Sequence, residues 1–334
     1  MSSLLESLSS SFSADTVGSI AKALGADSSA VGKGLGAIGP LLLGGMAGSA
    51  AKPGGVDALM KLIPQDGGSL FGNLGSMLSG LMGAGGAAAA GGGSIVNQLL
   101  GSGANAIGAS LSRTLGFNVA PLLSMAAPLL LGAVSKAMKA NNVDPGGLAA
   151  MLASERSAFA ANPANSEAMA LVNAATDAGG RAAATIAGYG GEWNNVSLAP
   201  AAATLMVAGA DLSGPFGAMK EAKAAGAALV AATQLASPAS VISAAFGGGL
   251  SIDMLNQLRE VAKTKDKLAA IIADGARSVA AKSPGELAAY KATVLKVAQA
   301  TAVAAKDGGF LGIGGTLVSA DEQAALDAIK AALA

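Results

Sequence analysis

The sequence predicts an all-α protein with two helical domains, and three observations carry this prediction. Apolar residues recur at helical spacing in several segments, Gly, Pro and Ser mark the ends of these segments, and no segment alternates like a β-strand. Charge divides the chain, because residues 1–150 hold 13 charged residues and residues 151–334 hold the other 29. We therefore place the boundary near Glu155, which gives domains of residues 1–154 and 155–334.

The composition argues against several classes of function. Without His and Cys, the chain lacks the usual proton shuttle, the commonest metal ligand and all thiol chemistry. The 21 basic residues balance the 21 acidic ones, so no basic excess is available for nucleic acid. No motif indicates a small-molecule substrate. We therefore predict that the protein is not an enzyme, uses no cofactor or metal, and does not bind nucleic acid.

The first 19 residues carry no Lys or Arg and alternate Ser with Leu. A secretory signal instead has a basic start followed by an apolar core. We expect a short amphipathic helix here and a cytoplasmic location, which the absence of Cys also fits.

A Pro-Leu-Leu-Leu-Gly motif occurs twice in the first domain, beginning at Pro40 and at Pro128. The two prolines lie 88 positions apart, and each motif has Leu-Gly before it and Pro-Gly-Gly after it (residues 24–25 and 53–55; residues 115–116 and 145–147). We predict an imperfect internal repeat of about 90 residues. Each copy is expected to be a helix, a turn, an apolar helix opened by proline, a second turn and a helix.

The residues of these motifs are candidates for close packing or assembly. Proline fits the first turn of a helix, because the N–H that it lacks would be unpaired there. Gly44 and Gly132 end the two motifs, and Gly48 follows Gly44 at the spacing that lets helices approach closely. We predict that Pro40, Pro128 and these three glycines pack closely against other helices or other copies of the chain.

A Gly/Ala-rich segment, residues 83–93, joins the two copies of the repeat. It is either a linker-like loop, which we favour, or a closely packed segment. Between Gly67 and Ser135, one charged residue, Arg113, occurs in 69 positions. Because monomers rarely expose large uncharged apolar surfaces, this stretch is expected to face protein or lipid.

Helix starts and apolar stripes predict further helices in the second domain. These are expected at residues 166–187 and 213–235, around a stripe at residues 252–262, from a Ser283–Glu286 capping box to about Ala305, and from Ser319 to the end, where Leu326, Ile329 and Leu333 form the buried side. The glycine-rich residues 308–315 fit no phosphate-binding motif and predict a turn.

Five short segments of the first domain occur in a characteristic order: residues 20–27, 40–45, 68–74, 95–101 and 127–132. Together they resemble the bacterial YidB-like domain of unknown function, over about residues 3–152. The resemblance implies an all-helical cytoplasmic domain without an assigned activity. The second half resembles only uncharacterised bacterial helical proteins.

We predict a structural protein that assembles with its own copies into a homo-oligomer, shell or filament through Gly/Ala-rich helices. The alternative is a membrane-active or membrane-associated protein. Residues 114–135 are 22 uncharged residues, long enough to span a bilayer as a helix, and Lys136 and Lys139 follow them. Because Asn118, Pro121 and Pro128 interrupt this segment, we place the membrane second.

Overall fold

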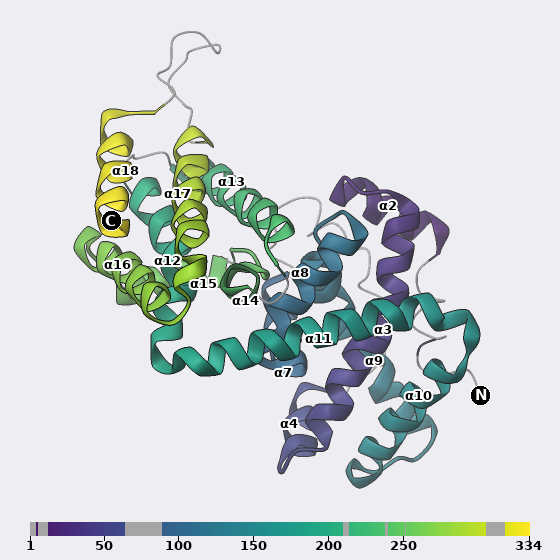
Figure 1. The fold of residues 1–334 in the computed structure, drawn as a ribbon. Helices are drawn as coiled ribbons and strands as arrows, with labels where there is room; N and C mark the ends of the chain where they lie inside the picture. The colour runs from purple at the N-terminus through teal and green to yellow at the C-terminus, as the bar shows by residue number, and fades with distance from the viewer. Residues whose placement is uncertain are drawn as a thin grey trace. The chain divides into compact units, whose positions relative to one another are not determined.

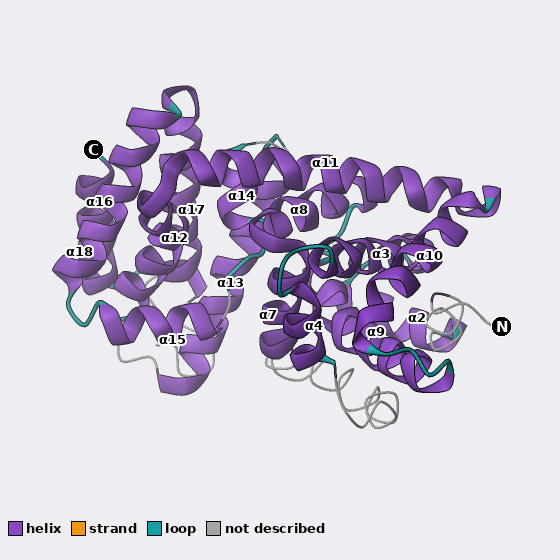
Figure 2. Ribbon diagram, turned by 90° about the horizontal axis from the view of Figure 1, so that it is seen from below, coloured by secondary structure: helices purple, strands orange, loops and turns teal. Residues whose placement is uncertain are grey.

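The computed structural model describes residues 5, 13–63, 89–209, 214–237, 240–250, 252–304 and 318–334. All regular secondary structure in these residues is helical (Figures 1 and 2), which confirms the predicted all-α class. The chain divides into two compact units, unit 1 (Met1–Gly180) and unit 2 (Arg181–Ala334). The boundary expected from charge lies instead within α10 (Leu148–Ala161), whose Leu148 and Leu152 are buried in the core of unit 1.

Unit 1 is built around one long helix, α3 (Ser28–Ala50), which packs against helices on several sides. Its neighbours are α2 (Ala14–Leu24), α4 (Gly55–Leu62), α7 (Ala89–Leu100), α8 (Ala104–Leu115), α9 (Ala120–Ala140) and α10. The short 3₁₀ helices η1 (Gly101–Gly103), η2 (Pro145–Gly147) and η3 (Pro163–Asn165) precede α8, α10 and α11 (Ser166–Tyr189).

Local sequence fixes the ends of several of these helices. Gly25 ends α2 and Gly116 ends α8, and both adopt positive φ angles, of 63° and 78°, that glycine reaches without strain. Asp27 caps α3, because its carboxylate accepts hydrogen bonds from the backbone N–H groups of Ser29 and Ala30.

Both motif prolines lie inside helices, so the predicted position in a first turn is wrong. Helix α3 begins at Ser28, twelve residues before Pro40, and α9 has Pro121 in its first turn and Pro128 in its interior. An interior proline removes one helical hydrogen bond, because it has no N–H to donate to the carbonyl four residues earlier. The carbonyl that loses its helical donor at Pro128 is that of Ser124.

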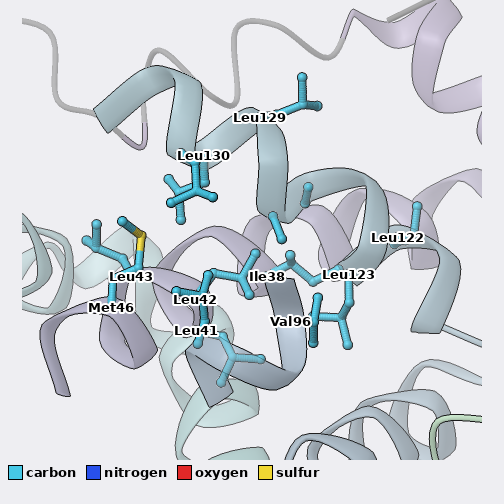
Figure 3. Close-up of a cluster of buried hydrophobic side chains, with 14 of the residues drawn as sticks. Ile38, Leu41, Leu42, Leu43, Met46, Val96, Leu122, Leu123, Leu129 and Leu130 are labelled. Carbon is cyan, nitrogen blue, oxygen red and sulfur yellow. The ribbon is translucent and has the colours of Figure 1, made fainter. Parts of the chain in front are cut away.

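The leucines of both Pro-Leu-Leu-Leu-Gly motifs are buried in the core of unit 1. Figure 3 shows most of them clustered with Ile38 and Met46 of α3 and Val96 of α7. Helix α9 buries 14 of its 21 residues and α8 buries 8 of its 12. The described part of the charge-poor stretch is therefore covered largely by its own chain, since a helix that is apolar on most sides belongs in a core.

Unit 2 is also built around one central helix, α12 (Trp193–Ala208), which was not predicted from the sequence. It buries 10 of its 16 residues, most of them small, and residues 193–210 contain no charge. The absence of charge in residues 193–210 was the feature of the sequence that could have predicted this buried helix. Around it pack α13 (Gly214–Leu235), α14 (Val241–Phe246), α15 (Ile252–Val261), α16 (Lys265–Lys282), α17 (Leu287–Ala304) and α18 (Ala320–Leu333).

Several predicted helix ends of the second half are confirmed. Helix α11 begins at Ser166, α13 ends at Leu235, and Ser319 and Glu322 form a capping box at the start of α18. The capping box at Ser283 and Glu286 is wrong. The carboxylate of Glu286 instead accepts a hydrogen bond of 2.7 Å from the N–H of Val241, at the start of α14. The predicted turn at residues 308–315 lies outside the described residues.

Candidate functional site

Helix α7 approaches two neighbouring backbones very closely in unit 1. A Cβ placed on Gly92 would lie 1.8 Å from the carbonyl oxygen of Ser124 in α9. A Cβ placed on Gly45 of α3 would lie 2.7 Å from the carbonyl oxygen of Leu99, near the end of α7. Both distances are too short for any side chain, so two glycines allow α7 to lie against α3 and α9 at backbone distance.

The contact at Gly92 involves the carbonyl that Pro128 leaves without a helical donor. In a regular helix the carbonyl of Ser124 would accept the N–H of residue 128, which proline lacks. Gly92 directs a Cα hydrogen toward this oxygen, at the position where another residue would carry its Cβ. Such C–H···O contacts contribute about 0.5–1 kcal/mol each. Pro128 removes the helical donor of the Ser124 carbonyl, and Gly92 allows α7 to contact that same carbonyl. The two residues therefore contribute to one contact between α7 and α9.

A second crossing in unit 1 brings two glycines together. A Cβ on Gly103 of η1 would lie 2.4 Å from the carbonyl oxygen of Gly179 in α11, and a Cβ on Gly179 would lie 2.6 Å from the Cγ1 atom of Ile107. Neither position has room for a methyl group. Neither glycine was predicted from the sequence, because neither lies in a repeated motif.

The five candidate residues differ in their burial and in the space around them. Pro40 and Gly132 are buried and Pro128 is half-buried. A Cβ on Gly44 would make an ordinary contact of 3.6 Å with the Nε atom of Arg156, and a Cβ on Gly48 would meet no described atom within 4 Å. The close crossing on α3 lies instead at Gly45, next to the residue predicted. Helical spacing could not choose between adjacent glycines, because α3 is buried on most sides. Any role of these residues in assembly stays a prediction.

The Gly/Ala-rich segment is helical where the structure describes it. Helix α7 begins at Ala89, and Gly92 is buried within it. For residues 89–93 the closely packed alternative is therefore correct and the linker-like loop is wrong. Residues 83–88 lie outside the described residues.

We expect Gly45→Ala to lower the stability of unit 1 by about 2 kcal/mol, because overpacking a crossing costs roughly 1–3 kcal/mol. Gly48→Ala should instead raise stability by up to about 1 kcal/mol, since alanine favours helix and its methyl group has room. Thermal melting of the two variants beside the wild type checks this pair. Equal melting temperatures would contradict the crossing at Gly45.

The described charged groups of unit 1 include an ion pair between two helices. Lys33 of α3 and Glu167 of α11 form an ion pair of 2.7 Å, and this hydrogen-bonded partner raises the pKa of Lys33 above its usual value. Both side chains are largely exposed, so the pair contributes little to stability. Within the described ranges, no three Asp or Glu side chains gather where they could hold a metal ion.

Two described helices are long and apolar enough to cross a membrane, namely α3 and α9. In their most apolar windows, 56% of the residues of α3 and 78% of those of α9 are buried inside the structure. The core helices of a folded domain have the same length and composition, so these helices alone are weak evidence for a membrane.

Comparison with known families identifies part of unit 1. Residues 6–137 match the family described as a bacterial protein of unknown function (DUF937). This match confirms the resemblance to a bacterial domain without an assigned activity. No curated protein and no solved structure matches the chain.

Proposed function

We propose that the protein is a non-enzymatic structural protein whose copies associate through unit 1. Part of this unit matches a bacterial family of unknown function. The observation that supports this is a surface without charge. Between Gly92 and Ser135 the sequence holds one charged residue, the half-buried Arg113. Burial of the core helices accounts for many of these residues but leaves an uncharged surface beside them.

This surface, which we call the neutral face, lies on α7 and η1. It consists of five exposed residues: Ser94, Asn97, Gln98, Gly101 and Ser102. None of these five residues carries a charge, so their own burial removes no charged side chain from water, a step that opposes binding. Hydroxyl and amide groups can hydrogen-bond across an interface. Because the net charge of the chain is zero, copies also repel one another little.

Size-exclusion chromatography with light scattering tests self-association directly. At micromolar concentration we expect a mass that is a multiple of 31.7 kDa, the mass of one chain. Electron microscopy of the same sample then distinguishes a closed oligomer, a shell and a filament. A monomer across the concentration range contradicts the proposal.

The variant Asn97→Asp/Gln98→Glu tests the neutral face without changing its shape. It adds two negative charges per chain, so we expect the assembly to weaken at least about tenfold, because charges must then be desolvated and repel across the contact. The matched control is Gln299→Glu on α17, where the residue is exposed outside the neutral face. Unchanged assembly in the double variant would remove the neutral face from the interface.

The membrane remains the second candidate, since α3 and α9 have the length and apolarity to insert. Insertion would require unit 1 to open, because both helices pack in its core. Flotation with liposomes distinguishes the two proposals. Protein that floats with vesicles but stays monomeric without them favours the membrane, and protein that stays at the bottom as an oligomer favours assembly in the cytoplasm.

A further inference from the structure

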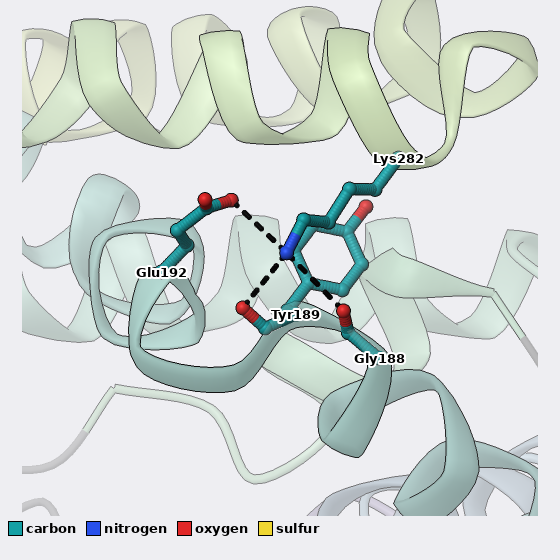
Figure 4. A network of polar contacts seen from close by, with 4 residues as sticks. All are labelled: Gly188, Tyr189, Glu192 and Lys282. Carbon is teal, nitrogen blue, oxygen red and sulfur yellow. Dashed lines mark hydrogen bonds and ion pairs between the residues drawn. The ribbon is translucent and has the colours of Figure 1, made fainter.

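The corner between α11 and α12 in unit 2 combines three glycines with one lysine from another helix. Helix α11 ends at Tyr189, the 3₁₀ helix η4 (Gly190–Glu192) follows, and α12 begins at Trp193. Lys282, the last residue of α16, reaches into this corner (Figure 4).

Packing explains none of the three glycines, and backbone conformation explains only one of them. A Cβ on Gly188, Gly190 or Gly191 would meet no atom of the described residues within 4 Å. Gly190 has a φ of 58°, which accounts for glycine there. Gly188 and Gly191 have neither a close contact nor a positive φ. The remaining property that distinguishes glycine at Gly188 and Gly191 is its backbone freedom, which makes a helix less stable than alanine would. The corner is therefore intrinsically loose.

Lys282 holds this loose corner by three polar contacts. Its ammonium donates hydrogen bonds to the carbonyl oxygens of Gly188, at 3.2 Å, and Tyr189, at 3.0 Å. It also lies 3.3 Å from a carboxylate oxygen of Glu192. The helix dipole favours a cation at this end of α11.

The aromatic residues of the corner support this position of the ammonium. The Lys282 nitrogen lies 5.6 Å from the centre of the Tyr189 ring, within the range of a cation–π interaction. Tyr189 is buried and packs edge-on against Trp193, with 5.3 Å between ring centres. The side chain of Lys282 itself remains 34% exposed and that of Glu192 54% exposed. Water or a reagent can therefore reach the contact while the ring stays packed.

We propose that residues 188–192 form a hinge and that Lys282 is the clamp that holds it closed. Neutralising the ammonium, or drawing it to another anion, releases the last turn of α11 from α16. The core of unit 2 does not depend on this clamp, because α12, α16 and α17 pack together through buried side chains and through the hydrogen bond from Tyr290 to Val196. The hinge is independent of the self-association proposed above.

Hydrogen–deuterium exchange on the full chain tests the clamp. In Lys282→Gln we expect the amides of residues 186–194 to exchange about tenfold faster or more, since hydrogen bonds to a charged group are among the stronger ones. Amides in the middle of α16 and α17 should keep their protection. Lys282→Arg keeps the charge and should stay close to the wild type. Unchanged exchange at the corner in Lys282→Gln would overturn the proposal.

A second set of variants separates a hinge from a general loss of structure. Adding Gly188→Ala and Gly191→Ala to Lys282→Gln should restore most of the protection, because alanine stiffens the corner and both methyl groups have room. Gly190 is left unchanged because of its positive φ. Faster exchange spread evenly over unit 2, or no recovery with the two alanines, would show that Lys282 supports the fold without controlling a hinge.

Discussion

Replacing Gly92 with alanine is expected to destabilise unit 1 by about 3 kcal/mol or more, at the upper end of the usual effect of overpacking. The added Cβ would lie 1.8 Å from the oxygen, 2.6 Å from the carbonyl carbon and 2.9 Å from the Cα of Ser124. All three are backbone atoms, so no change of rotamer can make room. Helix α7 would have to move away from α9, and the gain of about 1 kcal/mol in helix propensity cannot offset this.

The neighbouring glycine provides the control for this prediction. A Cβ on Gly93 would have its nearest contact at 3.8 Å, with the hydroxyl oxygen of Ser124, so Gly93→Ala should melt close to the wild type or slightly above it. Circular dichroism gives the melting temperatures, and hydrogen exchange of α7 and α9 shows where protection is lost. Gly92→Ala melting as high as Gly93→Ala would mean that the two backbones do not touch there.

The second large effect is expected for Gly275→Ala in unit 2, again about 3 kcal/mol. Gly275 lies on α16, where a Cβ would be 2.6 Å from the hydroxyl oxygen of Tyr290 and 2.7 Å from the carbonyl oxygen of Asn195. That hydroxyl donates a buried hydrogen bond of 2.9 Å to the carbonyl of Val196, and burial raises the pKa of Tyr290 above its usual range. A methyl group would displace both the hydroxyl and α12.

Two further variants make this result specific. Gly226→Ala on α13 has no described atom within 4 Å of its new methyl group and should not destabilise unit 2. Tyr290→Phe removes the hydroxyl, so the double variant Gly275→Ala/Tyr290→Phe should lose less than the sum of the two single losses. Strict additivity, or a stable Gly275→Ala, would contradict a crossing at this position.

Capping residues correctly predicted those helices whose ends depend on residues close by in the sequence. Ser319 and Glu322 act within a few residues of themselves, so their capping was readable. Glu286 was misread because its partner, the N–H of Val241, is 45 residues away. The central position of α12 was not predicted for a related reason. Small apolar residues indicate a segment without charge, but they do not indicate which helices surround it.

The closest backbone approach on α3 lies beside one of the five candidate residues, whose role in assembly stays a prediction. The motif in α3 indicated a close approach near Gly44, yet the tight contact lies at Gly45, because the direction from which α7 arrives is a tertiary feature. The meaning of the charge-poor stretch also differs in part from the expectation that it faces other protein or lipid. Much of it reflects burial inside unit 1, where α8 and α9 contact their own chain.

The small residues of the core reverse the usual pattern of mutational tolerance. In most cores the damaging substitutions remove atoms, because they leave cavities. Here α12 buries Ala199, Ala202 and Ala203 completely, and few atoms can be removed from such positions. The smallest buried residues, from which few atoms can be removed, are then the ones that least tolerate added atoms. A complete substitution scan of this protein should find its most restricted positions among glycines and alanines, while several leucines accept other apolar side chains of similar volume.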